Sequence, residues 1–131
     1  MRRFLVPGAV VLLMVFSLGA GTQVTQMRSG STVVITFGGM SGFQYVPSSV
    51  KVSVGDTVLW SGDLSFHPLV SDDGLWHTPF TGTTFSYTFV SAGTYRFHCL
   101  NHGGPGGFGM SGVVEVGFRI YLPIARRQGL R

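Results

Sequence analysis

Short segments with a two-residue hydrophobic period, separated by glycine-containing turns, most constrain what this 131-residue chain can fold into. Residues 50–54 alternate valine with lysine or serine, which predicts a strand with one buried and one exposed face. Similar alternating or β-branched segments lie at 33–37, 57–60, 85–89, 95–99 and 113–116. No stretch after the first 31 residues sustains the 3.6-residue period of a helix. We therefore predict an all-β fold, an antiparallel β-sandwich or barrel.

The N-terminus has the composition of an export signal. Arg2 and Arg3 precede 17 uncharged residues, 4–20, and small residues cluster at the end of this apolar run. We predict a signal peptide over 1–21 and a polar linker over 22–31. An uncleaved membrane anchor is the alternative, although 17 residues is the short end for a span. In both cases we expect the folded part outside the cytoplasm, in a periplasm, at the cell surface or in the extracellular medium.

The formal net charge of +4 comes from the ends of the chain and not from its centre. Residues 30–117 contain two basic and five acidic residues, a net charge of −3. Nucleic-acid binding needs a basic face on the folded domain, so this distribution disfavours it. The C-terminal segment 118–131 contains four arginines. This basic tail suits contact with an anionic membrane surface, and a disordered basic end is the alternative.

The single cysteine lies among other residues that bind metals. Cys99 ends a predicted strand, His102 follows three positions later and Met110 eight positions after that, while His67 lies upstream. Two histidines, one cysteine and a weakly bound methionine form the ligand set of blue-copper electron-transfer sites. We therefore predict one copper ion per chain, cycling between Cu(I) and Cu(II). A buried cysteine with no chemical role is the alternative.

The residue types suit copper because its two oxidation states prefer different ligands. Cu(I) prefers soft sulfur and Cu(II) prefers nitrogen, so a mixed set serves both. The glycine-rich segment 103–109 allows the chain to fold back over the metal. No formally charged side chain lies between Phe97 and Val114, which should favour Cu(I) and raise the reduction potential. A zinc site is the alternative, but a nearby thioether suits copper better.

Four motifs together resemble the cupredoxins, in particular the plastocyanin- and pseudoazurin-like small blue copper proteins. They are YVPSSVKVSVGDTVLW at 45–60, FH at 66–67, GTYRFHCLNH at 93–102 and GMSGVV at 109–114. The resemblance implies a Greek-key β-sandwich over 32–117. It also implies His67 and His102 as equatorial ligands, Cys99 as the thiolate ligand and Met110 as the axial ligand.

Two features depart from the family pattern. The segment between His102 and Met110 is longer than usual in such proteins. Pro68 follows His67 where the family often has Asn, Ser or Thr, whose side chain ties the two ligand loops together. Proline has neither such a side chain nor a backbone N–H, so we expect the surroundings of the metal to differ here.

We predict a monomeric electron carrier that shuttles one electron between redox protein partners. An apolar patch around His102 and Phe108 is the predicted docking surface. A copper-carrying or storage module is the alternative function, and a metal-free adhesion-type sandwich is a third. We do not expect an enzyme, because a multicopper enzyme needs further histidines, often as His-x-His, which the chain lacks. His98 alternates away from Cys99, and His77 is predicted to lie at the surface.

Overall fold

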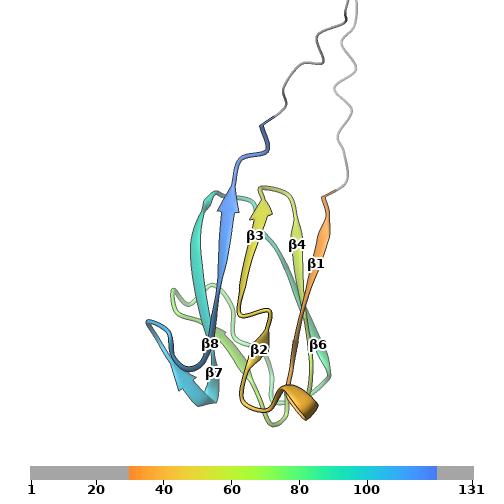
Figure 1. The fold of residues 1–131 in the computed structure, drawn as a ribbon, viewed down its shortest axis with the longest axis vertical. Coiled ribbons are helices and arrows are strands. Elements are labelled where there is room, and N and C mark those ends of the chain that lie inside the picture. The colour runs from red at the N-terminus through yellow and green to blue at the C-terminus, as the bar shows by residue number, and fades with distance from the viewer. Residues whose placement is uncertain (1–29, 121–131) are drawn as a thin grey trace, which may run out of the picture.

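The computed structural model describes residues 30–120, which form two four-stranded sheets packed face to face (Figure 1). The elements are β1 (Thr32–Phe37), the 3-10 helix η1 (Gly39–Ser41), β2 (Tyr45–Val46), β3 (Ser49–Ser53), β4 (Thr57–Ser61), β5 (Leu69–Ser71), β6 (Thr84–Thr88), β7 (Gly93–Gly104) and β8 (Phe108–Gly117). The β-sandwich predicted from the sequence is confirmed. The predicted signal peptide, nearly all of the linker and the tail beyond residue 120 lie outside the described residues.

The two sheets have the strand orders β2-β1-β4-β6 and β3-β8-β7-β5. The pairs β1–β4 and β3–β8 are parallel, and the other pairs are antiparallel. The prediction of an antiparallel sandwich is therefore wrong for these two pairs. The reason is that the chain passes between the sheets from β3 to β4, so that β4 returns beside β1 in the same direction. Sequence periodicity reports which face of a strand is buried, but not which strand lies beside it.

The core between the sheets is aromatic. Trp60 and Phe97 are fully buried, one from each sheet, and their rings meet edge to face with centroids 5.3 Å apart. On β4 the side chains of Val58 and Trp60 are completely buried, while their neighbours in the strand are only partly so. This alternation fixes the register, because a slip of one residue would expose Trp60.

The sandwich has two distinct ends. The described chain enters at Gly30 and leaves after β8 at one end, and the turn between β7 and β8 lies at the other (Figure 1). Because β4 runs parallel to β1, its connection to β5 lies at the β7–β8 end as well. Within the part of the chain that the structure describes, no helix has the length and apolar character needed to span a membrane.

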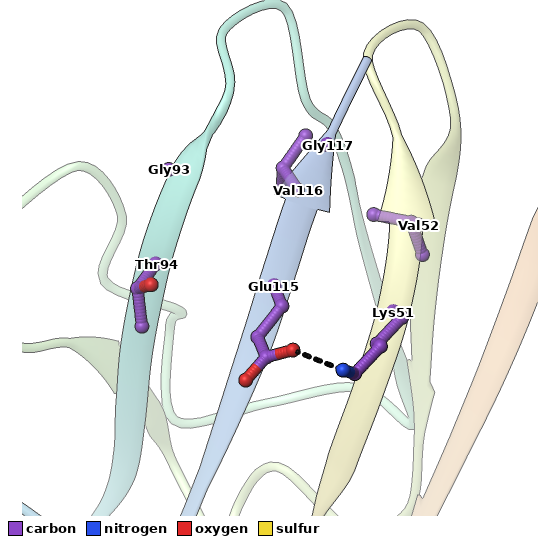
Figure 2. A pocket seen from close by; sticks show the side chains of 7 residues that line it. All are labelled: Lys51, Val52, Gly93, Thr94, Glu115, Val116 and Gly117. Atoms are coloured by element: carbon purple, nitrogen blue, oxygen red, sulfur yellow. Dashed lines mark ion pairs between the residues drawn. The ribbon is translucent and has the colours of Figure 1, made fainter. Parts of the chain in front are cut away.

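The outer face of the β3-β8-β7-β5 sheet is polar and solvated. A shallow hollow there is crossed by an ion pair between Lys51 and Glu115, with nitrogen and oxygen 3.0 Å apart (Figure 2). The two residues are cross-strand partners in the parallel β3–β8 register. Both side chains are exposed, and an exposed pair of this kind contributes little to stability. The hollow contains no cluster of catalytic or metal-binding groups.

Asp56 ties the two ends of the described chain together at the end of the sandwich away from the β7–β8 turn. The backbone N–H groups of Ser31 and Ser53 donate to its two carboxylate oxygens, each at 2.8 Å, and Arg119 forms an ion pair with it. Burial alone raises the pKa of Asp56, but these backbone hydrogen bonds and Arg119 outweigh it and hold the pKa below its ordinary value.

Asp56→Asn should lower the free energy of unfolding at neutral pH by about 1–3 kcal/mol, because the N–H donors of Ser31, Ser53 and Arg119 lose a charged acceptor. A lowered pKa in the folded state stabilises the protein above the unfolded-state pKa, about 3.9, and this stabilisation disappears as the pH falls through the folded-state value. Chemical denaturation of wild type and variant between pH 7 and pH 2 measures the difference. The exposed Asp73→Asn is the control. A difference that stays constant below about pH 4 would contradict this account.

Candidate metal centre

The predicted donors come from three parts of the chain. His67 lies in the connection between β4 and β5, where its backbone N–H donates to the carbonyl of Asp63 at 2.9 Å. Cys99 and His102 both lie on β7, and Met110 lies on β8. All four belong to the end of the sandwich opposite Gly30 and Ile120.

A large bulge in the β7–β8 ladder brings these residues together. His98 pairs with Ser111, but the next pair is Gly103 with Gly109. Four residues of β7, Cys99 to His102, therefore face the single residue Met110 on β8. An ordinary bulge opposes only two residues to one, so this one pushes a whole loop out of the strand. Met110 is buried, with 2% of its surface exposed.

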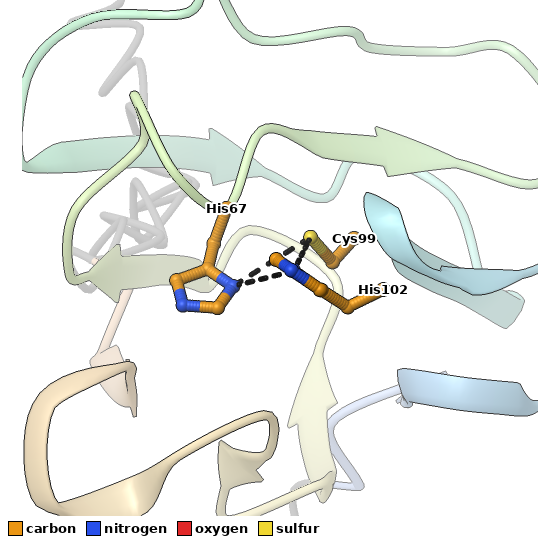
Figure 3. Close-up of side chains that lie close together, drawn as sticks. All are labelled: His67, Cys99 and His102. Atoms are coloured by element: carbon orange, nitrogen blue, oxygen red, sulfur yellow. Dashed lines mark hydrogen bonds between the residues drawn. The ribbon is translucent and has the colours of Figure 1, made fainter.

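Three donor atoms form a compact triangle (Figure 3). Cys99 Sγ lies 3.7 Å from His67 Nδ1 and 3.4 Å from His102 Nδ1, and the two imidazole nitrogens are 3.1 Å apart. A point equidistant from these three atoms lies about 2 Å from each, which is the length of a metal–nitrogen bond. The triangle therefore has room for one metal ion and no more.

The triangle is closed to solvent on the Cys99 and His67 sides. Cys99 is fully buried, 4% of His67 is exposed, and His102 is only partly buried. Burial and the neighbouring His102 lower the pKa of His67, although Asp63 opposes them. A neutral imidazole keeps a lone pair free, as metal binding requires.

Burial, and to a lesser extent Cys99, raises the pKa of Tyr45, whose buried hydroxyl has no hydrogen-bond partner among residues 30–120.

Aromatic rings surround the two imidazoles. The His102 ring lies 4.4 Å from the ring of Phe43 and 5.0 Å from that of Phe66, measured between centroids. Phe66 also meets His67 edge to face at 4.8 Å. Gly38 lies against the His67 ring, and a Cβ there would approach ring carbon Cδ2 to 3.3 Å. Phe43 is not predictable as part of the site, because nothing in its local sequence pattern places it beside His102.

The two ligand-bearing segments are tied together in spite of Pro68. The carbonyl of Pro68 accepts a hydrogen bond from the backbone N–H of Leu100 at 2.9 Å. Asn101 Nδ2 donates to the carbonyl of Phe66 at 3.1 Å. The side-chain donor thus comes from the cysteine segment and not from the residue after His67. Asn101 was not singled out in the sequence, although its place between Cys99 and His102 was a usable signal.

The glycine-rich segment between His102 and Met110, which the sequence predicts to fold back, forms a short hairpin. β7 continues to Gly104, β8 begins at Phe108, and Gly103 pairs with Gly109. Glycine is required at both paired positions because the strands approach closely. A Cβ on Gly103 would lie 2.3 Å from the carbonyl oxygen of Met110, and one on Gly109 would lie 2.4 Å from that of His102.

The other two histidines lie away from the triangle, as predicted. His98 Nδ1 is 2.7 Å from Asp72 Oδ1, on the face of β7 opposite Cys99. His77 is exposed in the connection between β5 and β6. Among residues 30–120, the one group of three or more His, Cys, Asp or Glu residues arranged to hold a metal is His67, Cys99 and His102.

The chemistry of the donors fits copper. A thiolate and two imidazoles, with a buried thioether on the facing strand, combine soft and borderline ligands as the copper couple requires. Zinc accepts the same three donors but gains nothing from a thioether. The residues are therefore suited to a single type 1 copper ion.

Comparison with known proteins bears on this assignment. No protein-family model matches the chain. Halocyanin from Natronomonas pharaonis is 34% identical over 88 residues, covering 59% of this chain and 52% of halocyanin. A plastocyanin from Scenedesmus fuscus is 32% identical over 99 residues, covering 64% of this chain and 98% of that protein. The chain belongs to the plastocyanin-like blue copper proteins. This blue copper protein spans about half the length of halocyanin and of the pea chloroplast plastocyanin, 52% of each.

Solved structures agree on the fold of this blue copper protein. Pseudoazurin from Hyphomicrobium denitrificans superimposes with a TM-score of 0.53 at 22% identity, over 66% of this chain and 76% of its own. An oxidized amicyanin variant superimposes with a TM-score of 0.51 at 28% identity, over 65% of this chain and 81% of its own. A copper-containing nitrite reductase from Thermus scotoductus gives 0.52 at 23% identity, but over only 23% of its chain, so it shares the fold of one part. None of these comparisons supports the alternative of copper delivery.

Gly103→Ala tests the close approach at the bulge. The added methyl group meets backbone and not a flexible side chain, so the strands must separate, at a cost of about 1–3 kcal/mol. Gly104→Ala is the matched control, because its Cβ would meet only the Phe108 side chain at 3.6 Å. In thermal unfolding of the metal-free proteins, the melting temperature of Gly103→Ala should be clearly lower than that of wild type. The melting temperature of Gly104→Ala should be close to that of wild type. Equal melting temperatures for the two variants would contradict the close approach of the two strands at Gly103.

Proposed function

We propose that this protein carries one electron at a time on a single copper ion, held by His67, Cys99 and His102 with Met110 as a weak axial ligand. The observation that supports this most strongly is the triangle of donor atoms, 3.1 to 3.7 Å apart, which surrounds a point at bonding distance from all three. Copper held by these residues would supply a one-electron redox couple, Cu(I)/Cu(II).

The protein's part is to keep these side chains in place as the charge changes. Cys99 is buried between the sheets, and hydrogen bonds from Leu100 and Asn101 tie its strand to the His67 segment. Ligands fixed on strands and on a tied loop move little when an electron arrives, which suits rapid transfer. The buried, uncharged surroundings of Cys99 exclude water and favour the less charged state of the site.

His102 is the proposed route for the electron. Of the three triangle residues it is the one that reaches the surface, between the exposed rings of Phe43 and Phe66. Leu100 on β7 and Phe108 at the start of β8 are also exposed at this end of the sandwich. The segment from Phe97 to Val114 has no formally charged side chain. We infer that a redox protein docks on this apolar face and exchanges the electron through the His102 ring.

We propose an electron carrier and not an enzyme. A second copper centre needs further histidines, but His98 is engaged with Asp72 and His77 lies apart at the surface. We also propose that the domain works as a monomer outside the cytoplasm, in keeping with the N-terminal signal pattern. Both described ends lie away from the His102 face (Figure 1), so attachment to a membrane through either end would leave that face free.

Copper-loaded, oxidised protein should show an intense visible absorption band that Cys99→Ser abolishes, because the thiolate–copper bond is its source. Visible spectroscopy of both proteins, with copper content measured in parallel, tests this expectation. Wild type should also keep its copper when reduced and exposed to a soft Cu(I) chelator. A colourless wild type refutes the proposal, and ready loss of copper to the chelator favours the delivery function instead.

Phe108→Glu should slow electron self-exchange between oxidised and reduced protein by about tenfold, equivalent to about 1.4 kcal/mol of docking free energy. The charge is placed on the apolar face, and Phe108 is 77% exposed, so the copper spectrum should not change. Phe118→Glu is the matched control, since Phe118 is 79% exposed at the opposite end. NMR line broadening in mixed samples measures the rate. Equal rates for the two variants would show that docking does not use this face.

A further inference from the structure

Asp72 connects the two sides of the bulge that carries Cys99 and His102. Its Oδ1 lies 2.7 Å from Nδ1 of His98, the last residue of β7 before the bulge. Its Oδ2 accepts a hydrogen bond of 2.7 Å from the backbone N–H of Gly106, in the turn beyond the bulge. One carboxylate therefore spans the loop that holds two of the three triangle residues.

Asp72 is itself firmly placed. It follows β5 directly, and its backbone N–H donates to the carbonyl of Arg96 at 2.9 Å, which continues the β5–β7 ladder by one residue. Its side chain is 17% exposed, and that of His98 is 8% exposed. Hydrogen bonds to an ionised carboxylate at this depth are stronger than neutral ones. Asp72 can therefore resist movement of the turn.

The turn has few other attachments. Pro105, Gly106 and Gly107 are exposed, and two of the three lack side chains that could pack on the sandwich. Beyond the bulge the two strands share only the pairs Gly103–Gly109 and Gly104–Phe108. Within residues 30–120, Asp72 provides the one side-chain hydrogen bond to this turn. Without it, the hairpin can pivot about the bulge.

We propose that Asp72 is a positioning residue of the metal centre. By holding Gly106 against His98, it sets the opening of the bulge and with it the separation of His102 from Met110. The long segment between these two residues needs such a clamp, because its exposed turn, Pro105 to Gly107, has little packing to fix it. The inference rests on the proposed copper-binding function, but Asp72 touches none of the four proposed ligands in the hydrogen-bond network.

Three variants separate the clamp from general stabilisation. Asp72→Ala removes both hydrogen bonds. Asp72→Asn keeps an amide oxygen that can accept from the Gly106 N–H and places an NH₂ group beside His98 Nδ1. Asp73→Ala is the matched control, because Asp73 is exposed and its side chain bonds only the N–H of Leu75.

We expect Asp72→Ala to weaken copper binding by about tenfold, the lower end of the usual effect of residues that orient metal ligands, and to shift the visible band. Asp72→Asn should have the copper affinity and visible band of wild type, and so should Asp73→Ala. Competition with a calibrated chelator and visible spectroscopy are the measurements. If Asp72→Ala changes only the melting temperature, with affinity and spectrum as in wild type, the clamp does not position the site.

Metal-free wild type provides a test that needs neither copper nor a folded variant. Hydrogen exchange followed by NMR should show the Gly106 amide protected, and this protection should be lost in Asp72→Ala if that variant folds. An unprotected Gly106 amide in metal-free wild type overturns the clamp, whatever copper does. A protected amide in a protein that binds no copper would instead refute the proposed function and leave the clamp in place.

Discussion

The structure of the site depends on one irregularity in the hydrogen-bonded ladder between β7 and β8. Four residues of β7 bulge out opposite Met110, so Cys99 stays in the core while His102 turns toward the surface. A regular ladder would place residues three apart on opposite faces of the sheet. The bulge cancels this alternation and lets both side chains face the same point. The glycines that close it, Gly103 and Gly109, are required by the short distance between the two strands.

The remaining contacts of the site compensate for this break in the ladder. The bulged segment is held to the β4–β5 connection, because the backbone N–H of Leu100 donates to the carbonyl of Pro68 and the side chain of Asn101 donates to that of Phe66. The carboxylate of Asp72 links the turn to the intact part of β7. A loop that has left its sheet is thus held on two sides, which is what a metal site with fixed geometry needs.

The two ends of the sandwich have different electrostatic character. At the end where the described chain enters and leaves, Asp56 and Arg119 form a partly buried ion pair that ties the two chain ends together. At the other end the surface around His102 is formed by phenylalanine rings and glycine, without formal charge from Phe97 to Val114. The Asp56–Arg119 pair lies away from the metal centre, whereas the face proposed for docking is formed mainly by phenylalanine rings.

Most of the strands, the buried faces and the proposed donors can be predicted from the sequence, because a two-residue period and the chemistry of Cys, His and Met are local properties. Residues 50–53, 57–60 and 95–99 lie in strands as predicted, whereas Val54 lies in the turn after β3. The parallel pairs, the hairpin at 103–109 and the roles of Phe43, Asn101 and Asp72 were decided only by the tertiary structure. Each of these depends on contacts between segments far apart in the chain, such as Asp72 with Gly106, and no local pattern records which distant segments will meet.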